Sequence, residues 1–268
     1  MTGGSSGLGL AVVQELLKEG IAKVIILDIA YPPQILLERA KYRVEYLNCD
    51  IANGYKLYRV LKQVFLRCKK NHQYISICVL SAGLRNSGSL LSLDSDQINQ
   101  AFNVNTFSQI WIQKALIESY LQDIHRRRRP KLYIVSIASI LGVLAPKNLS
   151  LYSATKAAVI QVHEALASEL SHIPSIRLLL VATGQLSTRM FDDVKPPKPF
   201  FAPLVDHLEL AKKIVIKINR GEKGVLCEPF YANFLPLVKC LPIVLQDLCR
   251  FFSGIDNSII ESHSDNSK

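Results

Sequence analysis

Short, continuously apolar runs alternate along this chain with segments of helical periodicity, and this alternation limits its fold more than any other feature. The apolar runs lie at residues 23–28, 43–49, 75–81, 132–138, 176–182 and 224–227. The helical segments lie at residues 8–18, 51–70, 97–121, 152–170 and 205–218. Strands that are apolar throughout are typical of parallel sheets covered on both faces. The pattern therefore predicts an α/β fold, with a doubly wound parallel sheet in a three-layer αβα arrangement.

Length and composition fit one large domain. The chain has 268 residues, 49% of them hydrophobic, which is enough for a substantial core. We expect one domain over residues 1–260 and a disordered polar tail over residues 261–268. The six cysteines show no metal or redox spacing, so we interpret them as reduced thiols of an intracellular protein. The six histidines form no ligand spacing either, and we predict no metal site.

The formal net charge of +10 favours an anionic partner, either a cofactor, a membrane surface or nucleic acid. No DNA-binding motif or interleaving of basic and aromatic residues accompanies the charge, so we expect no nucleic-acid partner. The basic run at residues 125–131 predicts a solvated loop after a helix. The alternative is contact with anionic lipid headgroups.

A glycine-rich loop opens the chain and runs directly into an apolar helix. Its glycines allow the backbone to turn sharply and approach a pyrophosphate, whose charge the helix N-terminus would meet. A flexible leader would explain the glycines but not the helix behind them. We therefore predict a dinucleotide-binding loop of Rossmann type, formed by Thr2, Gly3, Ser5, Ser6, Gly7, Leu8 and Gly9.

Two acidic residues end the next two predicted strands. Asp28 follows Gly9 by 19 residues and is placed to accept hydrogen bonds from an adenosine ribose while repelling a 2′-phosphate. This favours NAD over NADP, which stays an option, and an aspartate that merely ends a strand is the alternative. Asp50, followed by Ile51, either binds the adenine amino group or caps the following helix.

A serine, a tyrosine and a lysine have the spacing of a catalytic group. Tyr152 and Lys156 lie four residues apart in a predicted helix and therefore on one face. A cation there stabilises the phenolate, so we expect the tyrosine pKa to be lowered toward neutrality, as a general acid/base requires. Ser139 lies 13 residues before Tyr152, at the carboxyl end of a predicted strand, where ligands of parallel sheets bind.

These motifs together resemble the short-chain dehydrogenase/reductase family over nearly the whole chain. The resemblance implies an NAD(P)-dependent oxidoreductase with a catalytic tetrad of Asn105, Ser139, Tyr152 and Lys156. It implies that Tyr152 exchanges a proton with the substrate and Ser139 orients the carbonyl. Lys156 would hold the nicotinamide ribose and acidify the tyrosine, and Asn105 would support a water. Taken alone, Asn105 fits equally well as a helix-interior residue that bonds to backbone.

The chain departs from the family pattern at three places. Ser81-Ala82-Gly83 stands where the family has Asn-Ala-Gly, and Thr183-Gly184 where it has Pro-Gly. We expect both segments to contact the cofactor, together with Thr188. The third departure is the first strand, which is missing before the glycine loop. From this we infer a sequence that is truncated or starts too late, with a natural start upstream that would also carry any N-terminal anchor.

The substrate side reads as apolar. Residues 185–205 occupy the position of the family's substrate lid, and their apolar and aromatic residues favour a lipophilic substrate. The alternative is a loop packed by its own prolines. Residues 229–255 are apolar but contain prolines and charges, so they fit either a membrane surface or packing against the sheet edge. These segments are most similar to the membrane-associated retinol and hydroxysteroid dehydrogenase branch.

The expected activity is therefore interconversion of an alcohol and a carbonyl on a retinoid, steroid or fatty alcohol. We expect an association with membranes, such as the endoplasmic reticulum or a lipid droplet, or else a cytoplasmic location. A homo-oligomer is expected by analogy only. The competing hypothesis is a non-catalytic dinucleotide-binding or scaffold protein of the same fold.

Overall fold

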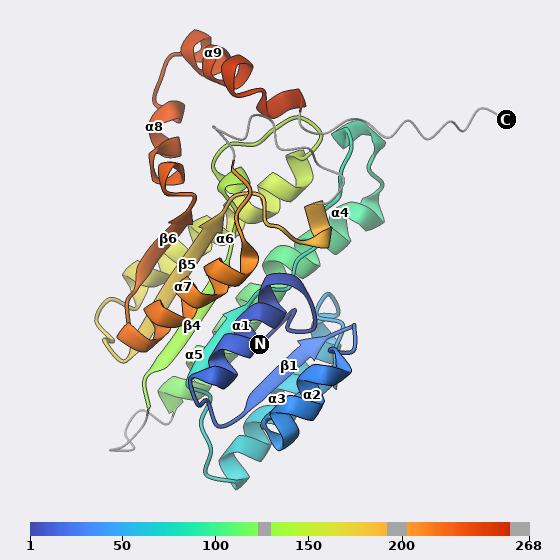
Figure 1. The fold of residues 1–268 in the computed structure, drawn as a ribbon, viewed down its shortest axis with the longest axis vertical. Helices are drawn as coiled ribbons and strands as arrows, with labels where there is room; N and C mark the ends of the chain where they lie inside the picture. Colours follow the sequence, from blue (N-terminus) through green and yellow to red (C-terminus); the bar gives the residue numbers. More distant parts are fainter. Residues whose placement is uncertain (123–129, 192–202, 258–268) are drawn as a thin grey trace, which may run out of the picture.

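The sheet of this protein is parallel throughout and falls into two parts. The computed structural model describes residues 1–122, 130–191 and 203–257. One part has the order β2-β1 and the other β3-β4-β5-β6. The strands are β1 (Val24–Asp28), β2 (Val44–Asn48), β3 (Ile77–Leu80), β4 (Leu132–Ile137), β5 (Ile176–Thr183) and β6 (Gly224–Glu228). The predicted doubly wound parallel sheet is confirmed, since every strand pairing is parallel (Figure 1).

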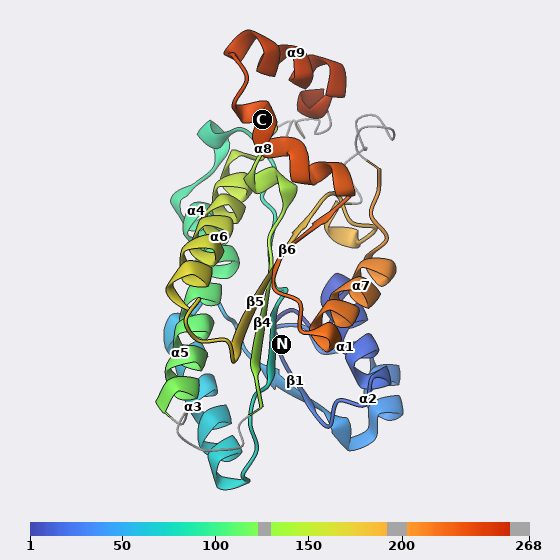
Figure 2. The ribbon, with the colours of Figure 1, turned by 90° about the vertical axis from the view of Figure 1, so that its left-hand side faces the viewer.

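Helices cover both faces of the sheet, which confirms the three-layer prediction. Figure 2 shows α3, α4, α5 and α6 on one face and α1, α2 and α7 on the other. Their bounds are α1 (Gly7–Lys18), α2 (Gln34–Ala40), α3 (Gly54–Lys70), α4 (Ser95–Phe102), α5 (Ser108–Gln122), α6 (Ser150–Glu169) and α7 (His207–Arg220). The sequence did not predict α2, a short helix of seven residues.

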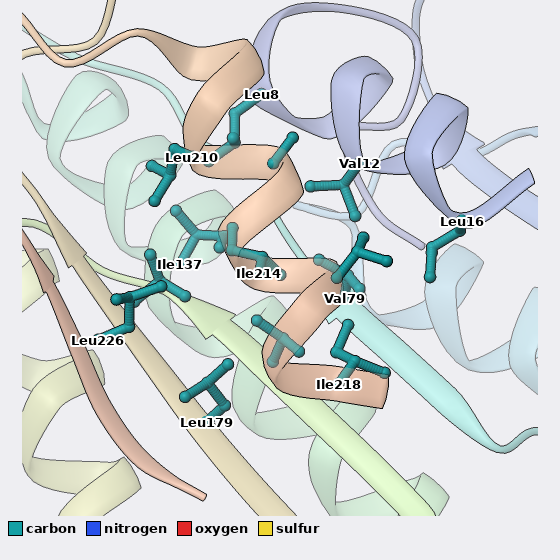
Figure 3. Close-up of a cluster of buried hydrophobic side chains, with 14 of the residues drawn as sticks. Leu8, Val12, Leu16, Val79, Ile137, Leu179, Leu210, Ile214, Ile218 and Leu226 are labelled. Atoms are coloured by element: carbon teal, nitrogen blue, oxygen red, sulfur yellow. The ribbon is translucent and has the colours of Figure 1, made fainter. Parts of the chain in front are cut away.

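One apolar core lies between the sheet and the helices α1 and α7. Leu8, Val12 and Leu16 recur along one side of α1 and meet Leu210, Ile214 and Ile218 of α7 above the strands (Figure 3). Both helices carry these residues at the spacing of one helical face, so burying that face stabilises helix and sheet together. A second cluster fills the other side of the sheet under α3 and α5.

At the centre of the sheet, Thr2 bridges the two parts. It pairs in parallel with Leu27 of β1 and with Leu80 of β3. Its N–H donates to the carbonyl oxygen of Val79 at 3.0 Å, and its carbonyl oxygen accepts from the N–H of Ser81 at 3.3 Å. Within the described residues no strand precedes α1.

Beside this bridge, a cavity of about 330 Å³ lies between the facing edges of β1 and β3. Because Thr2 pairs with both strands, these edges stand about 9.6 Å apart, twice the usual strand spacing. The cavity is therefore one strand wide. The ammonium of Met1 lies at it and donates to the carbonyl oxygen of Ile25 at 2.7 Å. Burial lowers the pKa of this ammonium, because the charged form loses its hydration.

The chain after β6 forms α8 (Leu235–Lys239) and α9 (Ile243–Ser253), which extend beyond the body of the protein (Figure 1). Neither helix has a buried residue. The alternative that residues 229–255 pack against the sheet edge therefore does not hold for these two helices, although Ala232, just after β6, is buried. Among the described residues, no helix is both long and apolar enough to cross a membrane.

Candidate active site

The predicted site residues converge at the carboxyl ends of the central strands. The glycine loop lies between β1 and β3, the loop of Gly83 follows β3, Ser139 follows β4 and Gly184 follows β5. Parallel strands deliver the ends of all these loops to one edge of the sheet, where ligands of such folds bind.

The glycine loop closes tightly against the start of α1. A Cβ at Gly9 would collide with the carbonyl oxygen of Gly3, so only glycine fits there. Gly3 itself has a φ of 65°, and a Cβ on it would lie 2.6 Å from the N atom of Ala82. Ser6 precedes α1 without capping it through its side chain, and the first turn holds no acidic residue. The helix N-terminus is therefore suited to an anion such as a pyrophosphate.

Asp28 ties the end of β1 to this loop. One carboxylate oxygen accepts from the N–H of Ser5 and the other from the N–H of Ala30, both at 3.0 Å. The hydroxyl of Ser5 donates to the carbonyl oxygen of Ala30 at 2.7 Å. The carboxylate thus stands beside the glycine loop, and its contact with a ribose stays a prediction.

Asp50 and Ile51 have different surroundings. The carboxylate of Asp50 accepts from the N–H of Ala52 at 3.0 Å, while the residue that caps α3 is Asn53. The alternative that Asp50 caps the following helix is therefore wrong. The side chain of Ile51 is buried in the core cluster under α3, which leaves its backbone as the part that could meet a cofactor.

The loop after β3 connects the glycine loop to the catalytic residues. The hydroxyl of Thr2 accepts from the N–H of Ala82 at 3.3 Å. A Cβ on Gly83 would lie 3.4 Å from the Oδ1 of Asn105 and 3.6 Å from the Nζ of Lys156. Asn105 and Lys156, which are far apart in sequence, therefore both lie next to Gly83.

Asn105 lies in a π-helical turn (Asn103–Phe107) between α4 and α5, so the predicted helical segment over residues 97–121 is helical throughout but contains a π-turn that the sequence did not predict. The side chain is 0% exposed. Its Oδ1 accepts from the N–H of Leu84 at 2.8 Å, and its Nδ2 donates to the carbonyl oxygen of Leu84 at 2.9 Å. Such π-turns often mark functional sites, and this one turns Asn105 toward the loop after β3.

Ser139 and Tyr152 face each other across the carboxyl ends of β4 and β5. The hydroxyl of Ser139 donates to the carbonyl oxygen of Thr183 at 3.2 Å. Burial raises the pKa of Tyr152 to about 12, while hydrogen bonding with Ser139 and the charge of Arg85 act in the opposite direction. The expected lowering of this pKa toward neutrality is therefore wrong, because desolvation of the phenolate outweighs the hydrogen bond with Ser139 and the charge of Arg85.

Lys156 lies one helical turn after Tyr152 on α6. Its Nζ donates to the carbonyl oxygen of Ile137 at 2.9 Å and lies 5.8 Å from the centre of the Tyr152 ring. Burial lowers the pKa of Lys156 to about 8, so the ammonium still predominates at neutral pH. The serine, the tyrosine and the lysine therefore share one site, as their spacing predicted.

Gly184 and Thr188 complete the cluster of predicted residues. The N–H of Gly184 donates to the carbonyl oxygen of Glu228 at 2.7 Å, which fixes the turn after β5. A Cβ on Gly7 would lie 3.4 Å from the Cγ2 of Thr188. Thr188 thus borders the glycine loop. Residues 192–202 of the predicted lid, the basic residues 125–129 and the predicted tail lie outside the described residues.

Three further residues of the site were not predicted. The ring of Phe191 meets the ring of Tyr152 edge to face, with 6.1 Å between centres, and the guanidinium of Arg85 lies 5.0 Å from the centre of the Phe191 ring. Thr155 accepts a hydrogen bond from Asn105. Thr155 lies inside the Tyr-x-x-x-Lys motif and Phe191 inside a segment already noted, but no pattern marked Arg85.

Comparison with known proteins agrees with this geometry. A family model described as short chain dehydrogenase matches residues 1–199. An uncharacterized oxidoreductase, TDA5, of Saccharomyces cerevisiae is 38% identical over 96% of this chain and 76% of its own length. Epidermal retinol dehydrogenase 2 of Mus musculus is 26% identical over 95% of this chain and 81% of its own.

Among solved structures, a 4-hydroxyisoleucine dehydrogenase complexed with NADH superimposes with a TM-score of 0.72. It shares 20% identity and covers 84% of this chain and 93% of its own, which shows the likeness of fold. The match of the family model to more than half of the chain and the identity to the yeast oxidoreductase carry the assignment. The chain therefore belongs to the short-chain dehydrogenase family of NAD(P)-dependent oxidoreductases.

Proposed function

We propose that this protein interconverts an alcohol and a carbonyl, with Tyr152 as the general acid/base. The observation that carries the proposal is the meeting of Ser139, Tyr152 and Lys156 at the strand ends, next to Gly83 of the adjoining loop. A nicotinamide cofactor, when bound, supplies or accepts the hydride. The protein supplies the proton, the orientation of the carbonyl and the surrounding electrostatics.

Each catalytic residue has a role that follows from its contacts. Ser139 is fixed by Thr183 and hydrogen bonds with Tyr152, so its hydroxyl would orient the substrate oxygen toward the phenol. With a pKa near 12, Tyr152 is protonated at neutral pH and ready to donate a proton to a carbonyl. The ammonium of Lys156 would hold the nicotinamide ribose. Asn105 would support a water while it anchors the loop after β3.

The dinucleotide would lie across the central loops. The closed glycine loop and the uncapped start of α1 fit a pyrophosphate. Asp28 beside Ser5 fits the adenosine ribose and disfavours a 2′-phosphate, so we propose NAD as the preferred cofactor, with NADP as the weaker one. Asp50 with Ile51, Ser81 with its two neighbours, Gly184 and Thr188 would form the remaining contacts.

The substrate side of Tyr152 is apolar. Leu149 and Phe191 pack with Tyr152 in a small buried cluster, and Leu141 borders it. Such walls suit a lipophilic alcohol or ketone, which the resemblance to a retinol dehydrogenase also favours. We propose a retinoid, steroid or fatty alcohol as the substrate class and a membrane surface as the place of action.

The first experiment titrates NADH and NADPH by nicotinamide fluorescence and then measures turnover of retinoids, steroids and fatty alcohols. Tyr152→Phe should keep NADH binding and lose turnover by about 10²- to 10⁴-fold. Tyr231→Phe, a half-buried tyrosine outside the proposed site, is the control and should keep both. Binding of neither cofactor, or cofactor binding with no turnover of any of these alcohols or their carbonyls, would favour the non-catalytic hypothesis.

A further inference from the structure

The helix α9 is amphipathic, but its polar side faces the protein and its apolar side faces outward. Gln246 and Arg250 lie on the inner side, where Gln246 donates to the carbonyl oxygens of Lys239 and Leu241 at 3.3 and 2.8 Å. On the outer side, Val244 is 73% exposed and Phe251 is 78% exposed. A helix of a globular domain normally buries its apolar side, whereas the described part of the chain leaves this side of α9 uncovered.

The exposed apolar side chains continue before α9 along the same stretch of chain. We name this set the C-terminal apolar surface. It comprises Phe230, Phe234, Leu237, Leu241, Ile243, Val244, Leu245, Leu248, Phe251 and Phe252, all of which are exposed. Large apolar surfaces on a domain mark sites that bind another protein or a membrane.

Hydrogen bonds fix this surface to the rim of the active site. The guanidinium of Arg250 donates to the carbonyl oxygen of Ala145 at 2.9 Å and pairs with Asp256 at 2.7 Å. The carboxylate of Asp256 accepts from the N–H of Lys147 at 3.0 Å. Ala145 and Lys147 lie on the segment between Ser139 and α6, which carries Tyr152. Whatever the C-terminal apolar surface binds is therefore held next to the catalytic residues.

We propose that the C-terminal apolar surface docks on the headgroup region of an anionic lipid bilayer. Helices α8 and α9 project from the body (Figure 2), and their exposed apolar side chains suit insertion between headgroups. Lys239, the last residue of α8, is exposed, and the chain as a whole carries a net charge of +10, which complements anionic lipids. A second copy could pair this surface with itself, but such an interface gives no reason for the cationic excess.

This placement deepens the proposed function, on which its consequence for the substrate rests. A lipophilic alcohol dissolves in the bilayer, and a site whose rim is docked there receives it without transfer through water. The docking itself needs no catalysis, because it depends on the exposed side chains and the charge alone. Docking and turnover can therefore fail separately.

The test is flotation of the full chain with phosphatidylcholine vesicles, with and without phosphatidylserine. The chain should float with both and more strongly with phosphatidylserine, and added salt should remove that excess. The double change Val244→Glu and Phe251→Glu should lower the bound fraction at least about tenfold, because two charges replace inserted side chains. Tyr42→Glu is the matched control, since Tyr42 is 96% exposed on the connection after α2, and it should bind like the parent.

Light scattering and NADH fluorescence accompany the flotation. Unchanged NADH binding by the double variant shows that its site has folded, so lost flotation then supports the proposal. Equal flotation of parent and double variant would overturn it. A soluble dimer that the double change dissociates, together with no flotation of the parent, would also overturn it in favour of a second copy. Flotation of a parent that shows no turnover would support docking and count against the proposed function alone.

Discussion

The side-chain amide of Asn105 donates a hydrogen bond of 3.0 Å to the hydroxyl of Thr155. This bond joins the π-helical turn before α5 to α6, the helix of Tyr152 and Lys156. The same amide group bonds to both backbone groups of Leu84. One buried side chain thus fixes the distance between the loop after β3 and the catalytic helix.

Asn105→Ala should therefore destabilise the protein and loosen the site. It leaves backbone groups of Leu84 without this partner in the interior, at about 1–3 kcal/mol for each buried group left unsatisfied. Thr155→Val removes one acceptor, and the Nδ2 of Asn105 keeps its bond to Leu84, so this change should cost only about 1 kcal/mol. Urea denaturation measures both losses. Equal losses for the two variants would show that the bonds to Leu84 contribute little.

The buried Lys156 should set the alkaline limit of carbonyl reduction. Its pKa of about 8 lies below the ordinary 10.5, so its charge disappears as pH rises through about 8, while Tyr152, near 12, stays protonated. The kcat/KM for reduction should hold at neutral pH and fall above about 8. Lys156→Arg keeps a charge at all these pH values and should move the limit upward. An unchanged limit in an active Lys156→Arg variant would assign it to another group.

The same lysine should make the free energy of unfolding depend on pH. Between pH 8 and 10.5 the unfolded chain binds more protons at this residue than the folded one. Its contribution to the free energy of unfolding should therefore rise with pH across that window and be constant below it. Urea denaturation of the parent and of Lys156→Met, compared at pH 7.5 and 10, isolates this contribution, because the methionine cannot titrate. A difference between the two proteins that does not change with pH would contradict the burial of the ammonium.

Asp28→Asn should shift the cofactor preference. The amide keeps an oxygen to accept from Ser5 or Ala30, but the negative charge that would repel a 2′-phosphate is lost. We expect NADPH binding to tighten about tenfold relative to NADH, as removal of about 1.4 kcal/mol of repulsion gives. Fluorescence titration of both cofactors measures the ratio. Asp247→Asn, at an exposed aspartate of α9 outside the proposed cofactor contacts, serves as the comparison, and an equal shift there would mean that overall charge, not the ribose site, decides the preference.

The cavity between β1 and β3 should accept one added strand. Five valine and isoleucine residues placed before Met1 would pair with both edges, fill the cavity and remove the buried ammonium. A gain of at least about 1 kcal/mol, or about 2–4 °C in Tm, is expected. A glycine and serine extension of equal length removes only the charge and should raise Tm less. Equal gains from both extensions would show that the strand position stays empty.

The sequence predicted the fold correctly where hydrophobic residues recur periodically. It missed features that depend on a local turn of the backbone. The apolar strands and the amphipathic helices α1 and α7 can be predicted because buried apolar residues recur along them at a regular spacing. The π-turn at Asn105 adds no break in hydrophobic pattern, so residues 97–121 read as one helix. The short helix α2 buries only Leu36 and Ala40, too little for a period to show.

The candidate site was recoverable because its residues stand at fixed spacings in single segments. What the sequence could not give were the contacts between segments. Arg85 reaches Phe191 from a loop more than a hundred residues earlier, and nothing in either segment encodes that meeting. The predicted direction of the Tyr152 pKa shift was wrong for a similar reason. The spacing to Lys156 shows the nearby cation but not how deeply the phenol is buried.

The sheet is divided into two parts that, among the described residues, Thr2 joins through its pairing with both; we call this division the seam. On one side lie β1, β2 and Asp28, and on the other lie β3 to β6 with the catalytic residues. A dinucleotide bound as proposed would span that seam, with its adenosine end on the smaller part and its nicotinamide end on the larger. The bound cofactor would then link the two parts of the sheet. Saturation with cofactor would raise the free energy of unfolding of the β1–β2 part more than that of the rest.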